Sequence, residues 1–147
     1  MQNRSGAGIY LDVRKNEIVI IPDARHEIGC STYLGTIYYK VVSPFDLQEL
    51  GDFILKSLAD SLRSPIVTSD MELSYSKEFS KLITYSKYKK YVKISTEEAD
   101  YLISPYRNYK RSYVTYKDDP EFKVDYGTDG EAIAQKVIDS FEFCKLQ

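Results

Sequence analysis

The residues best suited to chemistry lie in one short stretch, which contains the single histidine of the chain. Asp23, His26, Glu27 and Cys30 bring a thiol, an imidazole and two carboxylates close together in sequence. A cysteine nucleophile needs a base within hydrogen-bond reach and a third group that orients the base, and these residue types could supply all three. No catalytic signature surrounds Cys30, however, and a zinc site would need two further ligands. We therefore interpret the stretch as a loop of mixed charge and expect no catalytic residue, metal or cofactor there.

Two other patterns resemble functional motifs, but the residues around them do not fit those motifs. Residues 5–8 contain two glycines, but these precede a predicted strand, whereas the glycines of a phosphate-binding loop follow a strand and open a helix. The carboxylate pairs at residues 97–98 and 118–119 are adjacent in sequence, so on a strand they would face opposite sides. Nothing supports a glycosidase-like pair. We therefore expect that the protein is not an enzyme.

Tyrosines alternate with basic residues in one region of the chain. Residues 82–117 carry eight basic and three acidic side chains, whereas residues 118–147 carry three and eight. Tyrosine rings can stack on bases while lysines contact phosphates, so residues 85–117 could form a single-stranded nucleic-acid-binding module. The alternative is a set of strands and turns whose lysines face solvent and whose charge the acidic tail balances. The nucleic-acid hypothesis requires Tyr88, Tyr91, Tyr106, Tyr109, Lys89, Lys90, Lys110 and Arg111 on one face.

Length and composition limit the classes of protein to which this chain can belong. The chain has 147 residues, a formal net charge of −2 and a mean hydropathy of −0.39. Its longest aliphatic run is residues 18–21, whereas a membrane-spanning helix needs roughly 20 apolar residues. The N-terminal residues are polar and lack the apolar segment of a secretion signal, and two cysteines are too few for a disulfide scaffold. We expect one cytoplasmic domain over residues 1–147 and no membrane partner.

An internal repeat organises the chain. At an offset of 83 residues, ten pairs of apolar positions align; for example, Ile9 falls on Val92 and Pro22 falls on Pro105. Two copies are too few for a solenoid, so the pattern favours one domain with pseudo-twofold symmetry. The units are residues 8–62 and 91–143, joined by residues 63–90.

The first unit follows the order of three strands and a helix. Residues 8–13 alternate and lead through a turn into residues 17–21, which predicts a β-hairpin. Residues 33–42 are rich in β-branched and aromatic residues and predict a third strand. Ser43 and Pro44 then predict the N-cap and first turn of a helix. The apolar stripe of this helix is Leu47, Leu50, Ile54, Leu58 and Leu62.

The second unit repeats this order. Its predicted strands are residues 88–95, 101–104, 113–116 and 122–126. Thr128 and Glu131 form the pattern of a capping box before the final helix, and residues 76–83 predict a short helix between the units. The resulting class is α+β: a mainly antiparallel sheet with two long amphipathic helices and one short helix, built from two βββα-like pseudo-repeats.

The chain resembles the immunity proteins of bacterial contact-dependent growth inhibition, which are small cytoplasmic antitoxins. The resemblance is carried by GIYLDVRKNEIVIIP at residues 8–22, LGDFILKSL at residues 50–58, FSKLITYSKY at residues 79–88 and the second unit, which ends near Phe143. It spans most of the chain. One departure lies in the final helix, where Ala134 aligns with Gly51 of the first unit.

The resemblance implies a non-enzymatic inhibitor that binds and occludes the toxic C-terminal domain of a cognate effector, a nuclease. Loops on a rigid scaffold often hold recognition residues, and Tyr and Arg anchor interfaces. The loops after Pro22 and Pro105 are therefore the predicted toxin-binding sites, with contact residues Asp23, Arg25, His26, Glu27, Tyr106, Arg107, Tyr109, Lys110 and Arg111. Asp118, Asp119 and Glu121 form the alternative surface if the toxin is basic.

Overall fold

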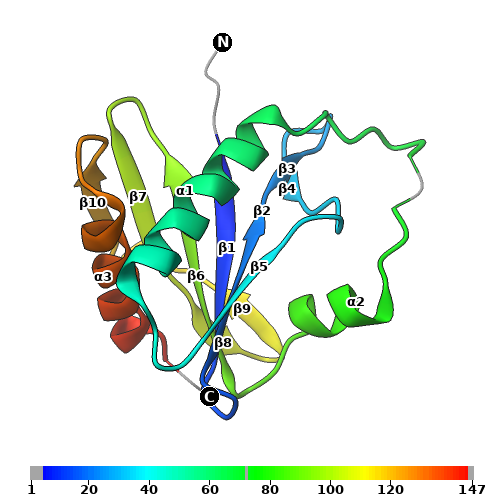
Figure 1. Ribbon diagram of the computed structural model, residues 1–147. Helices are drawn as coiled ribbons and strands as arrows, with labels where there is room; N and C mark the ends of the chain where they lie inside the picture. Colours follow the sequence, from blue (N-terminus) through cyan, green and yellow to red (C-terminus); the bar gives the residue numbers. More distant parts are fainter. Residues whose placement is uncertain (1–4, 72, 146–147) are drawn as a thin grey trace.

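A six-stranded antiparallel sheet forms the centre of the molecule, in the order β10-β7-β6-β1-β2-β5 (Figure 1). The computed structural model describes residues 5–71 and 73–145. The strands of this sheet are β1 (Gly6–Asp12), β2 (Glu17–Pro22), β5 (Tyr39–Val42), β6 (Lys89–Thr96), β7 (Asp100–Pro105) and β10 (Phe122–Asp125). With its three helices, the sheet confirms the predicted α+β class.

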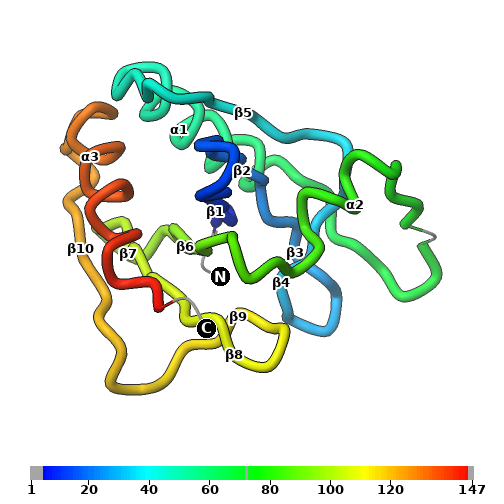
Figure 2. Tube along the Cα trace, turned by 90° about the horizontal axis from the view of Figure 1, so that it is seen from below, coloured from blue at the N-terminus to red at the C-terminus, as the bar shows by residue number. Residues whose placement is uncertain are grey.

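Both faces of the sheet are covered (Figure 2). The long helices α1 (Leu47–Arg63) and α3 (Gly130–Ser140) lie on one face, and the 3-10 turn η1 (Phe141–Phe143) continues α3. The short helix α2 (Lys77–Ile83) lies on the other. None of these helices in the described part of the chain is long and apolar enough to cross a membrane.

The two faces of β2 explain its unbroken aliphatic run. Successive side chains of a strand point to opposite faces. Ile18 and Ile20 pack under α1 in an aliphatic core, whereas Val19 and Ile21 pack under α2. Because each face is buried, neither face of the strand carries polar residues between Glu17 and Pro22.

The core under α2 is built mainly from aromatic rings. Phe79 of α2 is fully buried at its centre. The rings of Tyr10 and Tyr91 lie 4.8 Å apart, and the Tyr10 and Tyr33 hydroxyls are hydrogen-bonded at 3.0 Å. Such pairs add attraction beyond the area that they bury. Many of the 14 tyrosines are therefore explained by packing.

The helix starts differ from the sequence prediction. The N-cap of α1 is Asp46, whose carboxylate accepts a hydrogen bond from the backbone N–H of Glu49, so the prediction of Ser43 was wrong. Asp129 likewise caps α3 through the N–H of Ala132, in place of the predicted Thr128. In both cases an aspartate stands directly before the first helical residue, where its charge also favours the helix dipole. The short helix α2 confirms the prediction for residues 76–83, with Ser76 as its N-cap.

The predicted strand over residues 33–42 is shorter in the structure. Only Tyr39–Val42 pairs with β2. The chain before it turns at Gly35, whose φ of +84° suits glycine, and a Cβ there would meet the Tyr75 ring at 2.5 Å. Before this segment, residues 24–32 form a small hairpin of β3 (Ala24–Arg25) and β4 (Ser31–Thr32).

A second small hairpin occupies the corresponding place in the other half. It joins β8 (Arg107–Tyr109) to β9 (Ser112–Val114). The strand predicted at residues 113–116 is therefore found at residues 112–114. Within residues 5–71 and 73–145, each half therefore contains five strands before its long helix rather than the three of a plain βββα unit. The extra pairs form sheets of their own and leave the central sheet at three strands per half.

The central sheet is arranged about the pairing of β1 with β6. One half of the chain supplies β5-β2-β1 and the other supplies β6-β7-β10, and Ile9 lies opposite Val92 where they meet. A pseudo-twofold axis between β1 and β6 would produce this order. The hairpin registers differ, however: Ile20 lies opposite Ile9, whereas Ile103 lies opposite Ile94. The repeat of residues 8–62 in 91–143 stays a prediction.

The two long helices touch at a pair of glycines. A Cβ added to Gly51 of α1 would lie 2.9 Å from the Gly130 Cα and closer still to the Gly130 carbonyl group. Only glycine allows a backbone to approach this closely. Ala134, which aligns with Gly51 in sequence, is also buried in the core beneath the helices.

Candidate functional site

The two predicted binding loops lie at opposite ends of the sheet. Strand β2 pairs antiparallel with β1, β1 with β6, and β6 with β7. β2 and β7 therefore run in opposite directions, and their C-terminal ends lie at opposite ends of the sheet. The β3–β4 hairpin follows β2 at one end, and the β8–β9 hairpin follows β7 at the other (Figure 1). The fold does not bring Asp23 and its neighbours together with Tyr106 and its neighbours.

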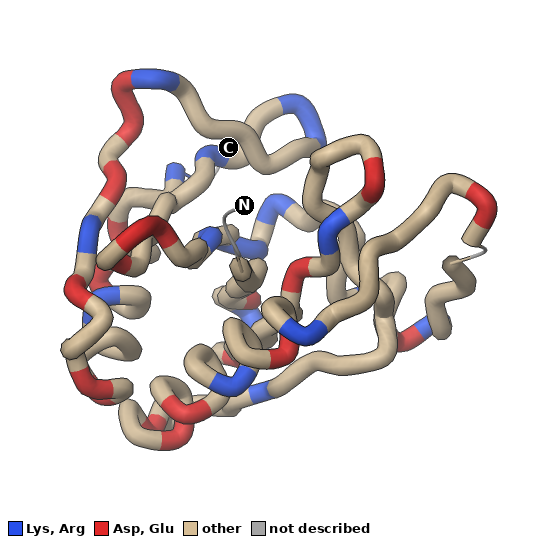
Figure 3. Tube along the Cα trace, turned by 90° about the horizontal axis from the view of Figure 1, so that it is seen from above, with Lys and Arg blue, Asp and Glu red and all other residues tan. Residues whose placement is uncertain are grey.

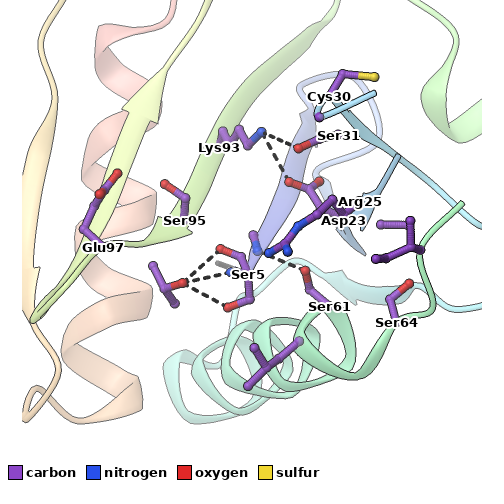
Figure 4. A pocket seen from close by; sticks show the side chains of 16 residues that line it. Ser5, Asp23, Arg25, Cys30, Ser31, Ser61, Ser64, Lys93, Ser95 and Glu97 are labelled. Carbon is purple, nitrogen blue, oxygen red and sulfur yellow. Dashed lines mark hydrogen bonds and ion pairs between the residues drawn. The ribbon is translucent and has the colours of Figure 1, made fainter. Parts of the chain in front are cut away.

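A cavity of about 540 Å³ opens at the β3–β4 end (Figure 4). Its walls come from the beginning of β1, the β3–β4 hairpin, the end of β6 and the last turn of α1. Most of the lining side chains are polar, and they include Asp23, Arg25, Ser61, Lys93 and Glu97. Two of the predicted residues, Asp23 and Arg25, thus line one cavity.

An ion pair lies in the wall of this cavity. Lys93 Nζ is 3.3 Å from Asp23 Oδ2, and the two side chains are only 28% and 10% exposed. Burial raises the pKa of Asp23, while the nearby Lys93 charge acts in the opposite direction. Gly6 leaves room for this carboxylate, because a Cβ there would lie 2.6 Å from Asp23 Oδ2. A side chain at this position would therefore have to displace the Asp23 carboxylate.

The remaining residues of the β3–β4 hairpin are held by backbone groups. His26 Nδ1 accepts a hydrogen bond from the N–H of Ile28. Glu27 Oε1 accepts one from the N–H of Ser69 at 2.9 Å, and this bond lowers the pKa of Glu27. Cys30 is exposed. These contacts fasten the hairpin and assemble no nucleophile with a base. In the described ranges no three His, Cys, Asp or Glu residues gather closely enough to hold a metal ion.

A second cavity, of about 210 Å³, adjoins the first. The two share Asp23, Ala24 and Ser64 in their walls. Its remaining lining is largely apolar and comes from the chain on either side of β3–β4 and from the end of α1; the apolar members are Pro22, Leu34, Ile37 and Pro65. A polar hollow and an apolar hollow thus lie side by side.

The β8–β9 hairpin presents charge at the opposite end. Its two turn residues, Lys110 and Arg111, have φ values of 47° and 61°, a conformation that hairpin turns usually assign to Asn and Gly. Lys110 Nζ lies 5.2 Å from the centre of the exposed Tyr109 ring. Arg107 forms an ion pair with Asp119, and its guanidinium lies 4.9 Å from the centre of the Tyr116 ring.

The groups required for nucleic-acid binding are only partly accessible. The Tyr91 ring packs edge-on against Tyr106 at 4.7 Å and belongs to the aromatic core. Lys89 Nζ donates hydrogen bonds to the carbonyls of Lys81, Leu82 and Thr84, and burial lowers its pKa. Tyr91 and Lys89 therefore serve the fold, and the exposed face that this hypothesis needs is incomplete.

The alternative acidic surface lies in the loop between β9 and β10, on the side of β10 where Phe122 packs against Phe143 of η1. Figure 3 shows how acidic and basic residues are distributed along the chain. Asp118 and Glu121 are exposed. Asp119 is held by the N–H of Tyr116 and by Arg107; these contacts lower its pKa, and the bond from Tyr116 contributes most. Only Asp118 and Glu121 of this set therefore offer carboxylates that are not already engaged within the loop.

Sequence reasoning missed several cavity residues. Lys93 stands on β6, 70 positions after Asp23, and it reaches Asp23 because β6 pairs with β1 across the two halves of the chain. Ser61 reaches the cavity from the last turn of α1, where its hydroxyl accepts a hydrogen bond from the N–H of Gly6. Leu62, predicted to belong to the core stripe, lines the cavity instead. No local pattern signals these contacts.

Comparisons with known proteins give a structural likeness alone. No family model and no curated protein matches the sequence. A protein of unknown function, NMB0488 from Neisseria meningitidis, is similar in structure with a TM-score of 0.71 and 16% identity, over 97% of this chain and 96% of that one. A chain of the CdiA-CT/CdiI toxin and immunity complex from Yersinia pseudotuberculosis is similar with a TM-score of 0.69 and 15% identity, over 97% and 98%. The fold is therefore shared along nearly the whole length of both.

Proposed function

We propose that this chain is an immunity protein that binds the toxic domain of a cognate effector of contact-dependent growth inhibition and blocks that domain by occlusion. The observation that supports the proposal most strongly is the fold shared over 97% of the chain with a chain of a toxin and immunity complex. The resemblance of residues 8–22, 50–58 and 79–88 to immunity proteins points the same way. A nuclease is the kind of toxin that we propose.

The site geometry favours binding over catalysis. The cavity wall holds an ion pair and hydroxyl groups, and the imidazole of the chain is hydrogen-bonded to backbone. An interface of ordinary size buries roughly 800 Å² on each partner, about a tenth of the 8792 Å² of accessible surface. A surface of that size would include one end of the sheet with its hairpin and cavities. Occlusion then needs no chemistry from this chain.

Co-expression tests the proposal in cells. The product of the reading frame immediately upstream is expressed in a laboratory strain, with and without this chain, and growth is followed. We expect arrest without the chain, recovery with it, and co-purification of the two proteins. An unrelated toxin serves as the specificity control and should not be neutralised. An upstream product that leaves growth unaffected when expressed alone would contradict the proposal.

A further inference from the structure

We infer that the toxin docks on the β3–β4 surface, defined here as the β3–β4 hairpin, the end of α1 with residues 64–66, and the turn between β6 and β7. The partner that fits this surface is a basic protein face with one apolar anchor. The inference rests on the proposed function and adds to it the place of contact and the chemistry of the partner.

Shape is the first argument. Cavities of about 540 and 210 Å³ adjoin on this surface and share Asp23, Ala24 and Ser64. Strong contacts in protein interfaces come from side chains that fill such hollows near the centre of the patch. The smaller hollow, lined by Leu34, Ile37 and Pro65, suits an apolar side chain.

Exposed apolar side chains are the second argument. Ile66 and Leu62 line the larger cavity although both remain more than half exposed, and Ile37 lines the smaller one while also exposed. Ile28 projects from the tip of the β3–β4 hairpin with a still larger exposed fraction. Single exposed apolar residues are ordinary, but several around adjoining hollows mark a site that a partner covers.

Charge identifies the partner. The turn between β6 and β7 carries Glu97 and Glu98, β7 begins with Asp100, and Glu97 lines the larger cavity. In the described part of the chain none of these three carboxylates takes part in an ion pair. Lys93 is already paired with Asp23. Arg25 also lines the larger cavity, and Arg63 pairs with Asp60 in the wall of the smaller one. Carboxylates still outnumber cations on this surface, because Asp23, Glu27, Asp60, Glu97, Glu98 and Asp100 stand against Arg25, Arg63 and Lys93. The net negative charge attracts a basic partner and accelerates its association.

The surface is also organised before binding. The N–H of Val67 donates to the carbonyl of Arg25, and the N–H of Glu27 donates to the carbonyl of Val67, each at 2.8 Å. The bond from Ser69 to Glu27 adds a third connection. A hairpin fixed in this way loses little conformational entropy when a partner binds.

The β8–β9 hairpin carries the wrong sign of charge for the same partner. The β8–β9 turn exposes Lys110 and Arg111, and Lys87 is exposed nearby on the approach to β6. Like charges brought together across an interface repel each other and weaken binding. Asp118 and Glu121 are exposed in the loop between β9 and β10, beside this hairpin, so the repulsion of a basic toxin is confined to the hairpin itself. A basic toxin would therefore be turned away from the β8–β9 hairpin, and an acidic one toward it.

Affinity measurements on matched variants test the inference. The probe is the toxin domain encoded upstream, inactivated at its own catalytic site, and the dissociation constant is measured by calorimetry. Ile66→Asp and Glu97→Lys alter the β3–β4 surface. Val42→Asp and Glu142→Lys are the controls, because Val42 is as exposed as Ile66 (60% against 55%) but lies on the edge strand β5, and Glu142 is an exposed glutamate in η1. Thermal unfolding confirms that each variant is folded.

We expect Ile66→Asp and Glu97→Lys each to weaken binding at least tenfold and the two controls to change it less than threefold. Affinity should also fall as salt concentration rises, because the attraction is electrostatic. If the two surface variants bind like the wild type while Tyr109→Ala or Arg111→Glu weakens binding, the docking surface is wrong and the proposed function stands. If the wild-type chain itself fails to bind, both fail.

Discussion

Gly51→Ala tests the packing of α1 on α3 most sharply. A Cβ at this position would lie 2.9 Å from the Gly130 Cα and nearer still to the Gly130 carbonyl. These are backbone atoms, so no side-chain rotation can relieve the overlap, and the helices must move apart. Overpacking of this kind typically costs about 1–3 kcal/mol and occasionally more, while alanine in a helix gains about 1 kcal/mol over glycine. Because the overlap is with backbone atoms, we take the upper end of the cost, about 3 kcal/mol, and expect a net loss of about 2 kcal/mol.

The matched control is Gly130→Ala at the other side of the same contact. A Cβ on Gly130 would lie 3.4 Å from the Gly51 carbonyl carbon and 3.5 Å from the Leu55 side chain, which are nearly ordinary distances. Gly130 is also the first residue of α3, so this variant should be neutral or slightly stabilising. Urea unfolding followed by far-UV circular dichroism measures both. A Gly51→Ala protein as stable as the wild type, or more stable, would refute the proposed close approach of the helices.

Two further predictions concern ionisable groups, one pair in the cavity wall and one tyrosine in the aromatic core. Lys93→Met leaves the buried Asp23 carboxylate unpaired and should cost about 1–3 kcal/mol at pH 7, less than a fully buried pair because Lys93 is partly exposed. The pKa of Asp23 is raised above its ordinary value of 3.8 in the fold, so a lower pH protonates the unpaired carboxylate and this cost should shrink. Urea unfolding of both proteins at pH 5 and pH 7 measures the difference. Burial raises the pKa of Tyr10 to about 12, so between pH 10 and 12 the unfolded chain loses this proton while the folded chain keeps it, and stability falls as the pH rises. Tyr10→Phe should remove up to about 2.7 kcal/mol of that fall; an unfolding free energy with the same dependence on alkaline pH in both proteins would contradict this.

Local patterns predicted the elements that pack on the central sheet. The spacing of Leu50, Ile54 and Leu58 located α1, and all three side chains are buried. Ser76 marked the start of α2 and caps it. These features depend on neighbours within a few residues, so the sequence alone contains enough information to find them.

The small hairpins and the cavities required the assembled sheet. β3 and β4 have two residues each, too few for a periodic signal, and the β8–β9 turn uses Lys110 and Arg111 where a sequence pattern would lead one to look for Asn and Gly. The pairing of Lys93 with Asp23 depends on the register between two halves of the chain. Likewise, the placement of the two binding loops at opposite ends follows from strand directions rather than from the loops themselves.

Direct titration of the purified toxin domain with the purified chain tests the central claim most directly. Light scattering coupled to gel filtration gives the stoichiometry of the complex, and the toxin's activity is measured in the same mixtures. We predict a one-to-one complex with a dissociation constant well below micromolar and toxin activity that falls to zero at equivalence. Separate elution of the two proteins, or a complex in which the toxin keeps its full activity, would contradict inhibition by occlusion.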